Sequence, residues 1–196
     1  MTIMDSKQYI LDSLRKNTKE VFARPTVTID HIKYEDRIGQ FKAILEAVGG
    51  LAYEIKEGED LSEVITRLFP EAKRIASNLE GVTCATFNPD EASTPRELNG
   101  TDLVVFRGDI GVCENGAVYY EQAFRHRAIY FIAEAICVIL DKSKLVDTMH
   151  EAYALVGNEL KGEFRGFISG PSKTADIEQS LVMGAHGARQ CVVLLI

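Results

Sequence analysis

Residues 169–178 bring together groups that commonly bind anions. The segment reads Ser-Gly-Pro-Ser-Lys-Thr-Ala-Asp-Ile-Glu, and a helix is expected to begin within it. The free amides of a helix start, the hydroxyls of Ser172 and Thr174 and the ammonium group of Lys173 would suit a phosphate or a carboxylate. The alternative is a plain helix cap, in which Ser172 or Thr174 caps the helix and Asp176 interacts favourably with its dipole.

A second candidate is Glu114, at the end of an expected strand. In open α/β sheets ligands collect at strand ends, and a partly desolvated carboxylate there can act as a nucleophile or a base. The alternative is structural: Asn115-Gly116 is typical of a two-residue hairpin turn, because both residue types tolerate a positive φ. Glu114 would then be an exposed residue beside that turn.

A third candidate is His186, within Gly184-Ala185-His186-Gly187. The glycines can end the preceding helix, and the imidazole can donate a proton, hydrogen-bond within a turn or pack. Arg125-His126-Arg127 forms a short basic cluster that faces either an anion or solvent.

The elements that must position these residues follow a clear order. Two helices with apolar stripes are expected at about 5–23 and 34–48, and Gly49-Gly50 ends the second. From residue 51 strands and helices alternate, which predicts an α/β fold of three layers: a mainly parallel sheet with helices on both faces. Residues 1–48 are therefore assigned to an N-terminal helical arm and residues 49–196 to the α/β domain. Strands are expected near 51–55, 74–77, 101–106, 110–113, 117–121, 135–140, 164–169 and 190–196, and helices near 60–68, 144–156 and 174–183.

Composition excludes several function classes. The chain has 196 residues, 46% of them apolar and 26% charged, and a net charge of −7, as expected for a folded domain. An acidic chain without an extended basic face does not favour nucleic acid. No apolar stretch has the length of a signal peptide or a membrane span, so we expect a cytoplasmic protein that does not enter a membrane.

The cysteines give no sign of a metal centre. No Cys-x-x-Cys pair is present, so neither a zinc ribbon nor an iron–sulfur cluster within the chain is expected, and no Gly-x-Gly-x-x-Gly motif points to NAD. Cys84, Cys113, Cys137 and Cys191 are instead expected to be buried as small apolar side chains.

The C-terminal segment carries a resemblance. Gly170-Pro-Ser-x-Thr174-Ala-Asp176-Ile-Glu178 and Gly184-x-His186-Gly187 resemble the closing signature of the LUD (lactate utilization) domain family, and residues 109–116 are similar to its second motif. The resemblance covers about residues 50–196. It implies a NagB/RpiA/CoA-transferase-like fold, a cytoplasmic location and a role in oxidising L-lactate to pyruvate with iron–sulfur partner proteins. On this reading the chain is an accessory subunit that binds a small anion or a CoA-type ligand and holds no cofactor of its own.

Glu114 leaves a second function open. Glu114-Asn115-Gly116 is also similar to the Ser-Glu-Asn-Gly motif of one class of CoA transferases, whose glutamate forms an acyl-CoA thioester adduct. This resemblance implies a free-standing enzyme that handles acyl groups or anions through Glu114.

Two expectations concern arrangement. The helical arm should cover the α/β domain or form a homodimer, because its apolar stripe needs a partner. Glu114, Ser172, Lys173, Thr174 and His186 should converge on one pocket. The full set expected at the ligand site is Glu114, Gly116, Gly170, Ser172, Lys173, Thr174, Asp176, His186 and Gly187.

Overall fold

The computed structural model describes residues 6–18, 22–23, 30–156, 164–175 and 181–196. The chain divides into two compact units, residues 1–31 and residues 32–196. The first unit contains helix α1 (Ser6–Asn17), of which no residue is buried. Among the described residues, no helix has the length and apolar character needed to cross a bilayer.

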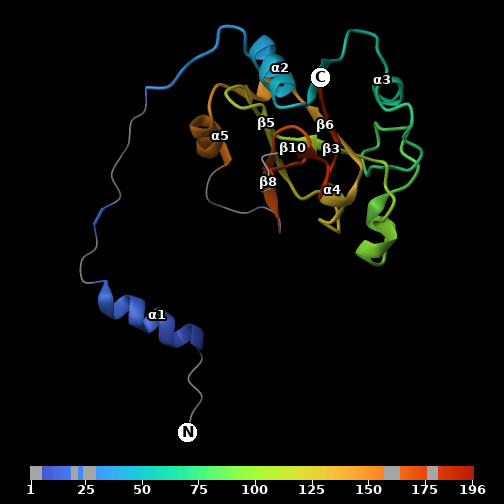
Figure 1. Ribbon diagram of the computed structural model, residues 1–196. Coiled ribbons are helices and arrows are strands. Elements are labelled where there is room, and N and C mark those ends of the chain that lie inside the picture. Colours follow the sequence, from blue (N-terminus) through green and yellow to red (C-terminus); the bar gives the residue numbers. More distant parts are fainter. Residues whose placement is uncertain (1–5, 19–21, 24–29, 157–163, 176–180) are drawn as a thin grey trace. The chain divides into compact units, whose positions relative to one another are not determined.

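A five-stranded parallel sheet forms the centre of the second unit (Figure 1). Its middle strand reads Ala-Ile-Cys-Val-Ile-Leu and is buried along its whole length, as the continuous apolar run predicts. All four strand pairings are parallel. In sheet order the strands are β1 (Leu51–Glu54), β11 (Gln190–Leu195), β6 (Ala135–Leu140), β3 (Leu103–Gly108) and β2 (Ile75–Ala76).

A second sheet of four strands packs against the first. Its order is β7 (Leu145–Val146), β4 (Ile110–Val112), β5 (Ala117–Glu121) and β8 (Arg165–Ile168). The β4–β5 and β5–β8 pairings are antiparallel, whereas β4 and β7 run parallel. The two sheets approach closely at Gly108, where a side chain would meet Val118 and Val138.

The faces of the central sheet are covered differently. Helix α3 (Leu61–Leu68) packs on one face, with Asp60 capping it by accepting a hydrogen bond from the Glu63 amide. Helix α2 (Arg37–Ala47) and the second sheet cover the other, where α2 buries Phe41 and Leu45 completely. The remaining helical elements are η1 (Pro89–Glu91), η2 (Pro95–Leu98), α4 (Ile129–Ile132), η3 (Lys142–Lys144) and α5 (Met149–Val156). The expected α/β class with a mainly parallel central sheet is thus confirmed.

Two expectations about helices need correction or refinement. The helix predicted for 174–183 is wrong: the described parts of that range belong to strands β9 (Lys173–Ala175) and β10 (Leu181–Met183), which pair antiparallel. The helix predicted for 144–156 begins only at Met149, because Leu145 and Val146 pair with β4.

Helix α2, which the sequence analysis assigned to the arm, lies within the compact unit of residues 32–196.

Candidate functional site

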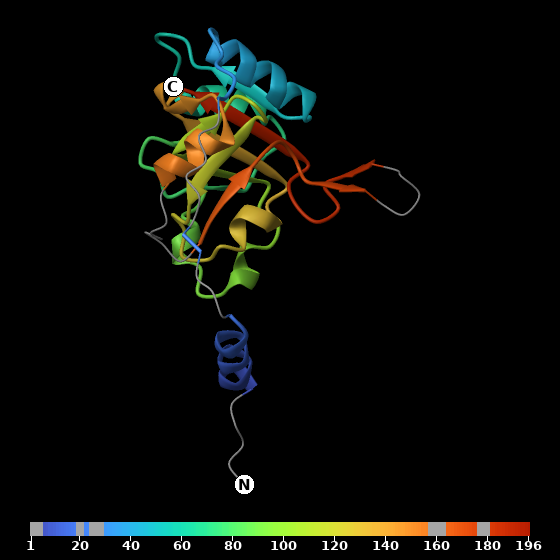
Figure 2. The same cartoon turned by 90° about the vertical axis from the view of Figure 1, so that its left-hand side faces the viewer.

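The β9–β10 hairpin brings the two halves of the C-terminal motif together. It projects from the rest of its unit (Figure 2), and Lys173 pairs with Met183 at its base. Beyond this pair, the Gly184 amide donates to the Ser172 carbonyl and the Ser172 amide donates to the Ala188 carbonyl, both at 2.8 Å. A ten-residue helix would have separated the same ends by about 15 Å. The hairpin therefore places residues 170–172 beside residues 184–188.

A cavity of about 180 Å³ opens at this junction. It lies where the carboxyl end of β8 meets the amino ends of β6 and β11. Its wall is mostly apolar, with Ser172 and His186 among its few polar side chains, and we call it the Ser172–His186 cavity. Its lining residues are Tyr130, Phe131, Ile136, Ile168, Ser169, Gly170, Pro171, Ser172, His186, Gly187 and Ala188.

The polar side chains of this cavity are accessible to solvent. Ser172 is half-buried and His186 is exposed. A Cβ atom on Gly187 would lie 3.2 Å from the Ser172 Oγ, so glycine leaves the space that the hydroxyl occupies. A hydroxyl and an imidazole on an apolar wall can hydrogen-bond a small polar molecule and exchange a proton with it.

Four of the expected ligand residues line this cavity, namely Gly170, Ser172, His186 and Gly187. Lys173 and Thr174 are not among its lining residues; they begin β9, where Lys173 is exposed. The expected helix start with free amides is therefore not formed at these residues. Asp176 lies outside the described residues.

Glu114 contacts a different element. It is exposed, and its Oε2 accepts a hydrogen bond of 3.1 Å from the Met149 amide at the start of α5. A carboxylate is favourable there because the first amides of a helix have no partner within it. The connection from β4 to β5 spans four residues, Cys113–Gly116, rather than the two of a type I′ turn, because Val112 pairs with Ala117.

The Glu114 loop nevertheless lies next to the C-terminal motif. The Ser169 hydroxyl donates a hydrogen bond of 2.7 Å to the carbonyl of Asn115. Gly116 and Gly170 both have a positive φ, 65° and 68°, and both pack against α2. A side chain would press on Leu45 at the first and on the Val48 carbonyl at the second, so a structural role explains both glycines.

An ion pair between Arg37 and the buried Asp147 lies behind the loop and was not predicted from the sequence. Asp147 is 1% exposed, and its two carboxylate oxygens accept hydrogen bonds of 2.8 and 2.7 Å from the Arg37 guanidinium. The Asp147 hydrogen bond raises the pKa of Arg37. Arg37 and Asp147 are 110 positions apart in the chain, so no local sequence pattern indicates their ion pair. This ion pair links the start of α2 to the segment between β7 and α5.

The cysteine environments agree with an apolar role. Cys113, Cys137 and Cys191 are buried, while Cys84 is half-buried. Burial raises the pKa of Cys113 to about 11 and that of Cys191 to about 12, so both thiols are protonated at neutral pH. Within the ranges that the structure describes, no group of three His, Cys, Asp or Glu residues is placed to hold a metal ion.

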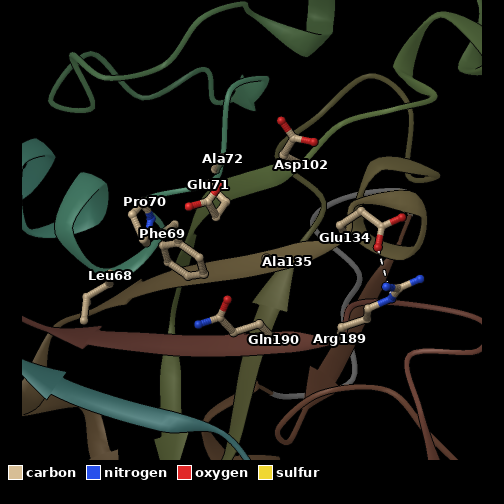
Figure 3. Close-up of a pocket in the computed structure, with 10 residues that line it drawn as sticks. All are labelled: Leu68, Phe69, Pro70, Glu71, Ala72, Asp102, Glu134, Ala135, Arg189 and Gln190. Atoms are coloured by element: carbon tan, nitrogen blue, oxygen red, sulfur yellow. Dashed lines mark ion pairs between the residues drawn. The ribbon is translucent and has the colours of Figure 1, made fainter.

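A larger cavity, of about 370 Å³, lies at the amino ends of β3, β6 and β11 (Figure 3). An ion pair of 3.2 Å between Arg189 and Glu134 crosses its edge, and both side chains are well exposed. The Asp102 carboxylate is occupied by the Arg74 and Lys73 amides, whose hydrogen bonds lower its pKa. None of the expected ligand residues lines this cavity.

The fold and the site together define an α/β protein whose C-terminal motif closes a small, mostly apolar cavity. The family model described as "LUD domain" matches residues 88–196, more than half of the chain. This chain belongs to the LUD domain family.

Curated relatives and a solved structure are consistent with this assignment. The chain is 37% identical over 127 residues to "Lactate utilization protein C" of Bacillus pumilus, covering 60% of this chain and 52% of the relative. It is 31% identical over 115 residues to the protein of the same name from Shouchella clausii, covering 56% and 50%. It thus spans about half the length of the curated relatives it matches. A crystal structure of a DUF162 family protein from Deinococcus radiodurans has the same fold, with a TM-score of 0.62, 16% identity and coverage of 81% of this chain and 95% of that one.

Proposed function

We propose that this chain is an accessory component of L-lactate utilization that binds a small 2-hydroxy or 2-keto acid in the Ser172–His186 cavity. The volume and the lining of this cavity are the observations that support the proposal. An engineered cavity of about 150 Å³ holds one benzene molecule, so 180 Å³ suits a ligand of about six non-hydrogen atoms, the size of lactate or pyruvate. Ser172 and His186 supply hydrogen bonds for a hydroxyl, a carbonyl or a carboxylate.

The proposal assigns the electron carriers to partner proteins. Oxidation of a 2-hydroxy acid to a 2-keto acid releases two electrons, which a cofactor must accept. The cysteine spacing of this chain offers no motif for an iron–sulfur cluster. The names of the curated relatives support a place in lactate utilization, and the proposal puts this chain in the cytoplasm beside iron–sulfur subunits.

Growth on lactate tests the proposal. Deleting the gene in the source organism should abolish growth on L-lactate as the carbon source and leave growth on glucose unchanged. The wild-type gene and a Lys173→Ala variant should restore growth, because Lys173 does not line the cavity. The double variant Ser172→Ala/His186→Ala should not. Normal growth of the deletion strain on lactate would refute the proposed role.

The acyl-transfer alternative predicts a different result. If Glu114 formed a thioester with CoA, incubation with an acyl-CoA donor would add the mass of an adduct to the wild-type protein and not to Glu114→Gln. We expect no adduct, because the Glu114 carboxylate caps α5 at Met149.

A further inference from the structure

A third cavity, of about 320 Å³, is rich in positive charge and lies between η2 and α4. These two short helices pack side by side, as the ribbon views show (Figures 1 and 2). We call it the Arg125–Arg127 cavity. No carboxylate lines it, although the chain as a whole carries a net charge of −7. It shares no lining residue with the Ser172–His186 cavity. Its lining residues are Pro95, Gln122, Arg125, His126, Arg127 and Ala128.

Hydrogen bonds hold the loop of residues 125–127 in place, while the guanidinium groups of Arg125 and Arg127 make no ion pair or hydrogen bond within the described part of the chain. The Arg125 amide donates a hydrogen bond of 2.7 Å to the Asp90 carboxylate, and the His126 Nε2 lies 2.9 Å from the Ala92 carbonyl. Arg125 and Arg127 are exposed, and within the described part of the chain their side chains have no ion pair or hydrogen bond. Both guanidinium groups are therefore available to an anion.

Gln122 supplies a second, independent observation. Its Nε2 donates to the carbonyls of Phe124 at 2.7 Å and Arg125 at 3.4 Å, which fixes the orientation of the amide. Its Oε1 is buried and accepts no hydrogen bond within the described protein. A buried acceptor without a donor is costly, so a change of side-chain conformation that lets the Oε1 meet a donor in the cavity would be favourable.

We infer that the Arg125–Arg127 cavity is a binding site for a phosphate group. Guanidinium groups bind phosphate through paired N–H donors, and two of them match a group that carries up to two negative charges. Hydrogen phosphate also carries a P–OH group that can donate to the Gln122 Oε1 once this side chain turns the oxygen toward the cavity. A carboxylate and a sulfate have no such donor at neutral pH. The assignment does not depend on the proposed role in lactate utilization.

Calorimetric titration of the full chain with inorganic phosphate, sulfate and acetate at constant ionic strength tests this site. We expect saturable binding of one phosphate per chain, weaker binding of sulfate and the weakest binding of acetate. Arg125→Gln and Arg127→Gln should each weaken phosphate binding about tenfold or more, since each removes charge-assisted hydrogen bonds. Both side chains are exposed, and circular dichroism would verify that the variants fold.

Arg96→Gln is the matched control. Arg96 is exposed and lies in the neighbouring η2, but it does not line the cavity. Its replacement changes the net charge by the same amount and should leave phosphate binding unchanged. Equal weakening by Arg96→Gln, or no saturable phosphate binding in the wild type, would overturn the assignment. Sulfate binding as tight as phosphate binding would overturn the part assigned to Gln122.

Discussion

Replacing Gly170 by alanine should destabilise the protein for two separable reasons. Its φ is 68°, a conformation that costs an L-residue about 1–2 kcal/mol. The new Cβ would also lie 2.7 Å from the Val48 carbonyl oxygen and 3.1 Å from the Val48 Cγ2. Overpacking of that kind typically costs a further 1–3 kcal/mol or so. The free energy of unfolding should therefore fall by about 2–5 kcal/mol.

Two other glycines separate these contributions. Gly100 has a φ of 76° but no atom within 4 Å of an added Cβ, so Gly100→Ala should cost only about 1–2 kcal/mol. Gly81 has neither a positive φ nor a close neighbour, so Gly81→Ala should be neutral or stabilise by up to about 1 kcal/mol.

Urea unfolding followed by circular dichroism would measure all three variants. The decisive quantity is the difference between Gly170→Ala and Gly100→Ala. Equal losses of stability would refute the close packing of Gly170 against the end of α2, and with it the structural explanation of this glycine in the motif.

Three further predictions concern charged side chains. Arg37→Met should lower the free energy of unfolding by about 1.5–3 kcal/mol in urea titrations, because it removes charge-assisted hydrogen bonds to buried Asp147; no measurable loss would contradict this ion pair. Hydrogen bonds from the Lys56 amide, Arg67 and Tyr53 lower the pKa of Glu59 to about 2. The ionised carboxylate of Glu59 therefore stabilises the fold fully above pH 4.5, and this stabilisation is lost as the pH falls to about 2. The stability gap between wild type and Glu59→Gln should accordingly close over that pH range in thermal melts, and a constant gap would refute the pKa shift. Glu114→Ala should cost about 1 kcal/mol in urea unfolding through the lost cap of α5, whereas Glu114→Gln keeps an acceptor and should cost less; equal costs would contradict the capping role.

The sequence predicted the elements whose pattern is local. The strand expected at 135–140 coincides with β6, and the strand expected near 51–55 contains β1. Asp60 caps α3 through the amide of Glu63, which lies only three residues further along the chain. In each case the residues that fix the structure are neighbours in the chain.

The errors arose where distant contacts decide the structure. Ser172, Thr174 and the acidic residues after them have the composition of a helix start, and only the pairing of Lys173 with Met183 makes the segment a hairpin. The same pairing brings His186 to Ser172, which a helix would not have done. The sequence thus identified four residues of the cavity but misjudged the element that joins them.

Titration of the isotopically labelled protein with L-lactate, followed by amide NMR, tests the central claim most directly. The Ser172–His186 cavity predicts saturable shift changes confined to its lining residues and their neighbours, that is, to positions near 130–131, 136, 168–172 and 184–188. Ser172→Ala should weaken these changes, and Lys173→Ala should leave them intact. The absence of any saturable shift, or shifts centred on the Glu114 loop or on Arg125–Arg127, would contradict the assignment of this cavity as the site for a small organic acid.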